Sequence, residues 1–280
     1  MYRIGIMQGR LSPPTDGRIQ SFPVSTWRQE FFAAREAGLY CIEWVYEAGT
    51  DGKNPLGSQD GIDAICDLVR ETGIRVDSVC ADYYMKERII GKDGSVNPQV
   101  ASHFLWLANQ VRLLGGRYMV LPFVDSSSMK TQNAREGLLR LFRSVRRELE
   151  SLNVEIHLET DFEPKVLAEM LREIDNPLVR ANYDIGNAAS LGHPASEELP
   201  LIGSSLGSVH VKDRLLGGTT VPLGKGSADF RTCFDLFKPM GYRGSFVLQA
   251  AREEGLTELA LALRNRRFVE DLLVQTAGRA

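Results

Sequence analysis

Short apolar runs alternate with longer amphipathic segments from one end of the chain to the other. Eight of the short runs are rich in apolar and β-branched residues and end at turn residues, which is typical of buried strands. We predict strands at 3–9, 41–47, 75–82, 117–125, 154–161, 179–186, 207–213 and 245–250. Strands that are apolar along their whole length are expected in a parallel sheet that is covered on both faces.

Between these strands the apolar residues recur at the spacing of one helix face. The helical segments are predicted around 25–38, 60–72, 97–114, 131–152, 163–175, 196–203, 228–239 and 256–275. Stretches such as "REAGLYCIEW" and "RLLGGRYMVL" place glycine between a helical run and the next strand, where a left-handed residue ends a helix. Eight strand-helix units predict an α/β fold, a single-domain (β/α)8 TIM barrel over residues 1–280, whereas a doubly wound open sheet more often has five or six strands.

Composition narrows the range of partners. The chain is 43% hydrophobic and 25% charged, and it contains no run of about 20 apolar residues, so no membrane segment is expected. The N-terminal stretch "MYRIGIMQGRLSPP" lacks the pattern of a secretory signal, and we expect a cytoplasmic protein. A net charge of −3 gives no general attraction to nucleic acid, and the arginines at 138–150 have the spacing of a solvated helix face.

The cysteines predict no metal cluster or disulfide framework. They are widely spaced and form no Cys-x-x-Cys pair, and we expect buried, reduced thiols at Cys41, Cys66, Cys80 and Cys233. The segment "GKGSAD" resembles half of a phosphate-binding loop, but the full motif and its preceding strand are missing, so nucleotide binding is not expected.

Polar residues stand at the ends of the last four predicted strands. They are Glu159 in "IHLETD", Asp184 in "NYDIGN", His210 in "VHVKDR" and Gln249 in "VLQAAR". Active sites of (β/α)8 barrels lie at the carboxyl ends of the strands, so these side chains are expected to converge. Two carboxylates, an imidazole and an amide oxygen form a suitable shell for a hard or borderline divalent cation.

Each of these residues also has a structural interpretation. A structural arginine would neutralise Glu159 as a cation would, Asp184 has the position of a cap before the next helix, and a lone histidine in a strand is usually a satisfied core residue. We favour the metal interpretation because the pattern repeats on consecutive strands. The other histidines, His103, His157 and His193, are expected to be structural.

Seven motifs together resemble a known family. "IGIMQGR", "GLYCIEWVYE", "IHLETD", "NYDIGN", "SVHVKDR", "VPLGKGSADF" and "GYRGSFVLQ" occur in order along nearly the whole chain and are similar to the sugar phosphate isomerase/epimerase group of the xylose isomerase-like TIM barrels. The resemblance implies a divalent ion, Mn, Mg, Co or Zn, held by Glu, Asp, His and Glu from strands five to eight. Glu159, Asp184 and His210 match the first three ligands, and Gln249 stands at the fourth.

Two positions depart from the family pattern. In the epimerases of this group, two glutamates on opposite faces of the substrate exchange protons, and a glutamine at the fourth position keeps a ligand oxygen but takes no proton. The formal ligand charge therefore changes from −3 to −2. The second departure is Asn187, where "DIGN" replaces the common Asp-x-x-His motif.

The resemblance assigns roles to further residues. Glu159 and Gln249 are the expected catalytic positions, and the expected substrate contacts are Arg10, Glu43, Asn187, Asp213 and Arg214. Salt bridges at the surface or within a loop are the alternative for Arg10, Asp213 and Arg214. A guanidinium such as that of Arg10 matches a carboxylate or a phosphate group in bidentate geometry.

The expected function is therefore that of a metal-dependent isomerase or epimerase of a sugar, keto-sugar or sugar phosphate that forms an enediolate. A lyase of the inosose dehydratase type and a carbohydrate-binding barrel without catalysis are the alternatives. Endonuclease IV, in the same superfamily, uses extra histidines for several zinc ions, and the four histidines of this chain disfavour that activity. The expected partner is a small carbohydrate, without nucleic acid or membrane, and related barrels often form homo-oligomers.

Overall fold

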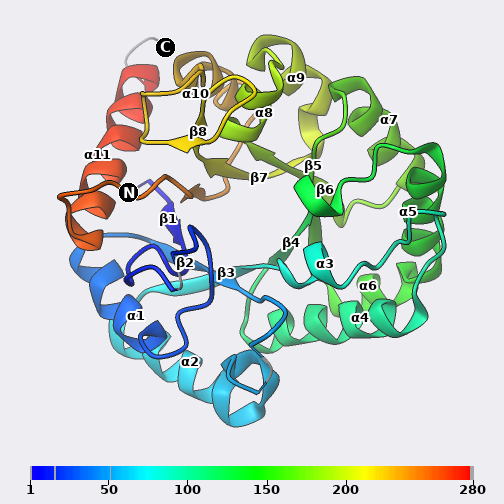
Figure 1. The fold of residues 1–280 in the computed structure, drawn as a ribbon, viewed down its shortest axis with the longest axis horizontal. Helices are drawn as coiled ribbons and strands as arrows, with labels where there is room; N and C mark the ends of the chain where they lie inside the picture. Colours follow the sequence, from blue (N-terminus) through cyan, green and yellow to red (C-terminus); the bar gives the residue numbers. More distant parts are fainter. Residues whose placement is uncertain (1, 16, 51, 278–280) are drawn as a thin grey trace.

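Parallel strands close into a barrel, with helices around the outside (Figure 1). The computed structural model describes residues 2–15, 17–50 and 52–277. Within them the barrel strands are β1 Ile4–Met7, β2 Cys41–Val45, β3 Arg75–Cys80, β4 Tyr118–Phe123, β5 Glu155–Thr160, β6 Val179–Asp184, β7 Leu206–Val211 and β10 Phe246–Leu248. Their order is β1-β10-β7-β6-β5-β4-β3-β2. The predicted (β/α)8 barrel is confirmed, while the predicted domain limits at residues 1 and 280 lie outside the described residues.

The barrel forms because its strands are apolar on both sides. All six residues of β4 and all five of β2 are buried, one set of side chains against the outer helices and the other inside the barrel. Parallel pairing of Ile4 with Phe246 joins the first strand to the last and closes the sheet. Because every strand runs in the same direction, the carboxyl ends of all of them meet at one rim.

The helices follow the predicted segments with a few differences. They are α1 Trp27–Glu36, α2 Gln59–Thr72, α3 Tyr83–Lys86, α4 Pro98–Leu113, α5 Gln132–Ser144, α6 Arg146–Leu152, α7 Pro164–Ile174, α8 Ile185–Leu191, α9 Ala195–Ile202, α10 Phe230–Phe237 and α11 Glu258–Ala277. The helix predicted at 131–152 is two helices, because Val145 leaves the helical conformation with φ −103° and ψ 8°. The short helix α8 follows directly after β6, two residues separate the short helix α3 from the end of β3, and neither was predicted.

The predicted strand at 207–213 was too long. Barrel strand β7 ends at Val211, and Asp213 belongs to a separate hairpin in which β8 Asp213–Arg214 pairs antiparallel with β9 Thr220–Val221. This hairpin stands above the carboxyl rim, because its first strand follows one residue after β7. Its first strand carries Arg214, which lines a cavity together with Glu159 and Gln249.

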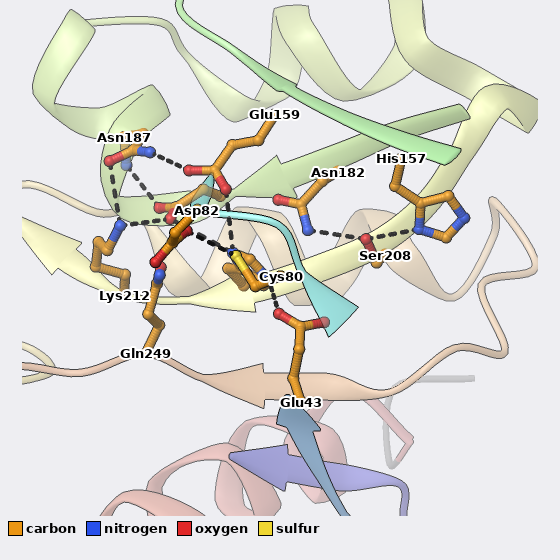
Figure 2. A network of polar contacts seen from close by, with 12 residues as sticks. Glu43, Cys80, Asp82, His157, Glu159, Asn182, Asn187, Ser208, Lys212 and Gln249 are labelled. Atoms are coloured by element: carbon orange, nitrogen blue, oxygen red, sulfur yellow. Dashed lines mark hydrogen bonds and ion pairs between the residues drawn. The ribbon is translucent and has the colours of Figure 1, made fainter. Parts of the chain in front are cut away.

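The middle of the barrel interior holds a buried polar layer (Figure 2). The ring of His157 stacks on Tyr118 with 4.2 Å between centroids, and its Nδ1 lies 2.9 Å from the Ser208 hydroxyl. Ser208 in turn accepts a hydrogen bond from Asn182. The ring fills the space that a side chain at Gly207 would need, because a Cβ there would lie 2.5 Å from His157 Nε2. His157 is thus a core residue, as expected.

The structure also bears on the expectations about membrane-spanning segments and about the cysteine thiols. Among the helices of the described residues, none combines the length and the apolar character of a membrane span. The four cysteines lie within the described part and are free thiols, three of them buried, while Cys66 is partly exposed.

Candidate metal and substrate site

Three predicted ligands converge at the carboxyl rim. Glu159, Asp184 and His210 come from β5, β6 and β7, and each offers a ligand atom within 4.8 Å of the other two. The strand register explains this, because Asp184 and His210 are directly paired neighbours in the sheet. All three side chains are buried. The convergence that the sequence predicted for these positions is present.

The His210 ring is held in one orientation by Glu43. Nε2 lies 2.7 Å from Glu43 Oε1 and donates its proton to that carboxylate. The other nitrogen, Nδ1, lies 3.5 Å from Glu159 Oε2 and 3.9 Å from Asp184 Oδ2. Within the described residues, Nδ1 makes no hydrogen bond of ordinary geometry. A histidine whose outer nitrogen is bonded to a carboxylate presents its other lone pair to a metal.

The buried carboxylate groups of the site are stabilised by a positive charge beside them. Burial opposes the charged form of His210, but the carboxylates of Glu43 and Glu159 outweigh burial and raise the pKa of His210 to about 10. Burial likewise opposes ionisation of Glu43, and the opposite charge of His210 overrides it and lowers the pKa of Glu43. Several carboxylates in so small a buried volume require a cation, and in the protein alone the imidazolium supplies it.

Asp184 serves two neighbours with its two oxygens. Oδ1 accepts a hydrogen bond from the backbone N–H of Asn187 and so caps α8, which confirms the capping interpretation. Oδ2 lies 2.7 Å from the ammonium of Lys212. Lys212 reaches this position across Gly186, where a Cβ would lie 2.8 Å from the lysine Cγ. Capping uses Oδ1, so Oδ2 is the oxygen that a metal ion would share with the Lys212 ammonium.

Gln249 lies at the same rim but belongs to a different network. Its Nε2 donates to Gln20 Oε1 at 2.9 Å, and Gln20 Nε2 donates to Asp82 Oδ2 at 2.7 Å. These bonds determine which way the Gln249 amide is turned. Its Oε1 is buried and has no hydrogen-bond partner among the described residues. A buried amide oxygen without a protein partner has lone pairs available to a water molecule or an ion.

A cavity of about 520 Å³ opens above these groups. Of the predicted site residues, Arg10, Glu159, Asn187, Arg214 and Gln249 line it. Asp184 and His210 are buried immediately beneath Glu159, within reach of its carboxylate. The cavity is thus walled by residues from opposite ends of the chain and has the convergent polar groups of a small-molecule site.

The predicted substrate contacts Asn187 and Arg214 are bonded to each other. Asn187 Nδ2 donates to Glu159 Oε1 at 2.7 Å, and Arg214 Nη1 donates to Asn187 Oδ1 at 2.9 Å. The Arg10 guanidinium donates to the carbonyl of Ile19 and, at 3.4 Å, to Gln20 Oε1. Asn187 therefore orients the carboxylate of Glu159, in addition to lining the cavity.

Two other predicted substrate contacts lie away from the cavity lining. Glu43 is fully buried and is bonded to His210 and to the hydroxyl of Ser78, so the structure places it behind a ligand. The Asp213 carboxylate accepts hydrogen bonds from the backbone N–H groups of Gly224, Gly226 and Ala228. Asp213 therefore organises the "GKGSAD" loop, whose amides surround a carboxylate of the protein itself.

Sequence reasoning missed Gln20, Asp82 and Lys212. Lys212 had a signal, because it follows His210 by two residues in "VHVKDR" and so lies on the same side of the strand. Asp82 also had one, because it ends the predicted third strand at the functional rim. Gln20 had none, since it lies in an irregular loop after β1.

The residues present fit a divalent cation. Two carboxylates and an imidazole with Nδ1 directed to them are ordinary oxygen and nitrogen ligands for Mg, Mn, Co or Zn. The unpartnered Oε1 of Gln249 at the same cavity is a candidate fourth ligand. Nδ1 of His210 faces the carboxylates of Glu159 and Asp184 without a hydrogen bond of ordinary geometry, and this observation favours a metal over a purely structural cluster.

Known proteins resemble this chain in sequence and in fold. L-ribulose-5-phosphate 3-epimerase UlaE of Escherichia coli K12 is 24% identical over 253 residues, which cover 87% of this chain and 89% of that protein. The solved structure of an L-ribulose 3-epimerase has a TM-score of 0.74 at 16% identity and covers 100% of this chain and 97% of its own. The IOLI protein, solved with a bound zinc atom, has a TM-score of 0.77 at 13% identity, with coverage of 98% and 99%.

A match to a family model assigns this chain to a family. The model described as a xylose isomerase-like TIM barrel matches residues 31–271, which include β2 to β10 and all the converging ligands. The family that the sequence motifs resembled is confirmed by this match. The chain belongs to the xylose isomerase-like TIM barrel family.

Proposed function

We propose that this protein is a divalent-metal-dependent isomerase or epimerase of a sugar, a keto-sugar or a sugar phosphate. The observation that carries the proposal is the convergence of Glu159, Asp184 and His210 within 4.8 Å beside a cavity that Glu159 also lines. One carboxylate thus faces both the metal position and the space for a substrate. Similarity to named sugar epimerases supports an enzyme of this class.

Glu159, Asp184 and His210 would hold the ion, with Gln249 Oε1 as the fourth ligand. A bound divalent ion supplies Lewis-acid polarisation of a carbonyl oxygen, which acidifies the neighbouring C–H bond. The IOLI neighbour has a zinc atom, which supports a metal in this fold. The native cation stays open among Mn, Mg, Co and Zn.

Glu159 is the proposed base for the proton α to the carbonyl. Asn187 donates to its Oε1 and so holds the carboxylate against the cavity, with Oε2 on the His210 side. Removal of the proton leaves an enediolate, and return of a proton to the same or the adjacent carbon gives an epimer or an isomer. The residue that returns the proton determines which of the two products forms.

The cationic residues of the cavity wall are proposed to bind the substrate. Arg10 and Arg214 present guanidinium groups, which suit hydroxyl, carboxylate or phosphate oxygens. Lys212 lies nearby, 3.4 Å from Asn187 Oδ1. Because one relative is named for a phosphorylated ketose and one structural neighbour for a free ketose, both L-ribulose 5-phosphate and L-ribulose are suitable probes.

Metal analysis and hydrogen exchange test the proposal. The purified protein is expected to contain about one divalent ion per chain, and His210→Ala is expected to lose it. With either probe in deuterated water, the enzyme is expected to introduce deuterium at the carbon next to the carbonyl. The matched control is His193→Ala, because His193 lies near Glu163 and Glu198 away from the described site, and this variant should keep its metal.

The same experiment separates the alternatives. A binding barrel without catalysis would leave the α-hydrogen in place, and a dehydratase would give a product lighter by one water. Equal metal content in the wild type, His210→Ala and His193→Ala would contradict the metal site itself.

A further inference from the structure

The cavity contains a second carboxylate that the proposed chemistry has not used. Asp82 follows the end of β3 by two residues and lines the same cavity as Glu159 and Gln249. It is partly buried, and it is joined to Gln249 through the single amide of Gln20 (Figure 2 shows Asp82 and Gln249). Two hydrogen bonds therefore connect Asp82 to Gln249, the residue that stands where the family pattern has a glutamate.

Epimerisation at a carbon atom requires two proton-transfer groups. One removes the hydrogen from one face and the other delivers a proton to the opposite face. The Gln249 amide performs neither task, because it has no acidic proton or basic lone pair at neutral pH. If the reaction inverts a centre, another side chain of the cavity has to complete it.

Apart from Glu159, the two arginines and the threonine hydroxyls, four described side chains of the cavity lining carry or accept a proton: Cys80, Asp82, Asp125 and Lys212. The Lys212 ammonium is already paired with Asp184. Asp125 is exposed at the rim, where water competes for it. Burial raises the pKa of the Cys80 thiol well above its ordinary value, and its Sγ donates to Asp82. Asp82 is the remaining candidate.

The local environment of Asp82 suits a group that exchanges protons. Oδ2 accepts from Gln20 at 2.7 Å and Oδ1 accepts from Cys80 Sγ at 3.2 Å, so the carboxyl group is oriented while further lone pairs remain. Burial raises the pKa of Asp82 to about 6, and the negative charge of Glu159 acts in the same direction. A carboxyl group that titrates close to neutral pH serves equally as acid and as base.

The two carboxylates also face the cavity from different walls. Glu159 is bonded to Asn187 and lies beside His210, on the side of β6 and β7. Asp82 is bonded to Gln20, which belongs to the loop after β1 and contacts the residue that follows β10. Both carboxylates line the cavity, at the carboxyl ends of β3 and β5, which are separated by β4 in the barrel, so a substrate there is within reach of each.

We propose that Asp82 is the second acid-base residue of this cavity and delivers a proton to the face of the substrate carbon opposite Glu159. The proposal rests on the proposed function, and it selects epimerisation over aldose-ketose isomerisation. Asp82 replaces the carboxylate that is missing at Gln249, with Gln20 holding both side chains in place.

The proposed step balances. Glu159 accepts the α-proton, the C–H electron pair forms the C=C bond of the enediolate, and the carbonyl π pair moves to oxygen. Protonated Asp82 then donates its proton to the other face. The C=C pair forms the new C–H bond and the oxygen pair restores the carbonyl. Glu159 ends protonated and Asp82 ionised, and proton exchange with water restores both.

Asp82→Asn tests the proposal without removing its hydrogen-bonded frame, because the amide oxygen still accepts from Gln20. The matched control is Asp77→Asn, at the other end of the same strand, where the carboxylate pairs with Arg75. Both variants are compared with the wild type for thermal unfolding, metal content, inversion of L-ribulose or L-ribulose 5-phosphate, and uptake of deuterium from water.

Asp82→Asn is expected to lose inversion by at least about 100-fold while it keeps its metal and its melting temperature. With the epimer whose α-hydrogen faces Glu159 as substrate, the variant should still exchange that hydrogen with water within about tenfold of the wild-type rate. With the other epimer, whose α-hydrogen faces Asp82, the variant should exchange no α-hydrogen. Asp77→Asn should keep both activities.

Inversion by Asp82→Asn within about threefold of the wild type would overturn the inference and leave the proposed function intact. Equal loss of exchange from both epimers would also overturn it, because Asp82 would then act on the whole site. If the wild type exchanges no α-hydrogen in either probe, the proposed function fails and the inference fails with it.

Discussion

The cavity has two walls that hold their polar groups by different means. The wall formed by β5, β6 and β7, called here the cation wall, gathers Glu159, Asp184 and His210, with Glu43 behind the histidine. The wall formed by β3, β10 and the loop after β1, called here the amide wall, joins Asp82 to Gln249 through Gln20. Both walls line the same 520 Å³ cavity through Glu159, Asp82 and Gln249.

Because the two walls hold their polar groups differently, they suit two different chemical tasks. On the cation wall, buried carboxylates surround the imidazole of His210, and this arrangement suits a positively charged group such as the imidazolium or the proposed metal ion. On the amide wall, the amides of Gln249 and Gln20 form a chain of hydrogen bonds that ends at Asp82, a carboxyl group without an ion pair in the described structure. Such a carboxyl has a raised pKa, which suits it to proton transfer and not to ligation.

The largest effect is expected from Glu159→Gln, because Glu159 is the proposed base and one of the proposed metal ligands. Turnover of L-ribulose or L-ribulose 5-phosphate should fall by about 10⁴-fold, and metal content should fall with it. Glu155→Gln is the matched control on the same strand, at the far end from the cavity, where Glu155 contacts His157. Turnover by Glu159→Gln above about one hundredth of the wild-type rate would show that the cation wall is not the catalytic one.

The next effect tests whether the amide wall replaces a missing carboxylate. In the Asp82→Asn background, Gln249→Glu should recover inversion by about 100-fold, because it returns an acid-base group to the wall that lost one. Stereochemical assay of the product measures the recovery. A double variant as inactive as Asp82→Asn alone, with its metal retained, would argue that the two walls are not interchangeable in this way.

A smaller change is expected behind the cation wall. Glu43→Gln keeps the size of the side chain but weakens the charge that orients His210, and metal affinity should fall by about 10-fold to 100-fold. Titration of the metal-free protein with Zn or Mn measures it. Ser78→Ala is the matched control, since Ser78 bonds the other Glu43 oxygen and leaves the histidine contact in place. Equal affinities in both variants and the wild type would contradict the positioning role of Glu43.

The smallest effect concerns the loop that carries Gln20. Its start is held by Glu30, whose buried carboxyl accepts the backbone N–H groups of Gly9 and Leu11. Burial raises the pKa of Glu30 from 4.5 to about 7. Between these two pH values the folded state therefore keeps a proton on Glu30 that the unfolded state has lost. The stabilising contribution of protonated Glu30 is therefore complete below about pH 4.5 and is lost as the pH rises to about 7.

Denaturant unfolding of the wild type and of Glu30→Gln measures this effect. The free energy of unfolding of the wild type, relative to the variant, should decline by roughly 2 to 3 kcal/mol between these pH values, because the glutamine does not titrate. Subtracting the variant cancels the other groups that titrate in the same range. Parallel curves would show that Glu30 is not the source of the pH dependence.

Much of the fold and the cation wall followed from local pattern. Apolar strands alternating with amphipathic helices predict a parallel barrel, and parallel strands bring residues at their carboxyl ends to one rim. Glu159, Asp184 and His210 were found for that reason. The break at Val145 was not, because a helix that changes direction keeps its apolar spacing on both sides of the break.

The amide wall could not be predicted in the same way. Gln249 Nε2 and Gln20 Oε1 meet although 229 residues separate them, and the meeting depends on the path of an irregular loop. Glu43 was placed at the correct strand, but its partner His210 lies 167 residues away across the barrel. Long-range contacts between side chains leave no periodic mark on the sequence.

The sequence by itself determined the barrel and the convergence of Glu159, Asp184 and His210, because strands that alternate with helices run parallel and their carboxyl ends share a rim. The family followed from the resemblance of its motifs, which the family model confirms. Only the tertiary structure decided that Glu43 and Asp213 act behind the cavity, that Lys212 reaches Asp184, and that Gln249 is tied through Gln20 to Asp82. These decisions depend on distances between side chains from remote segments, which exist only once the barrel has closed.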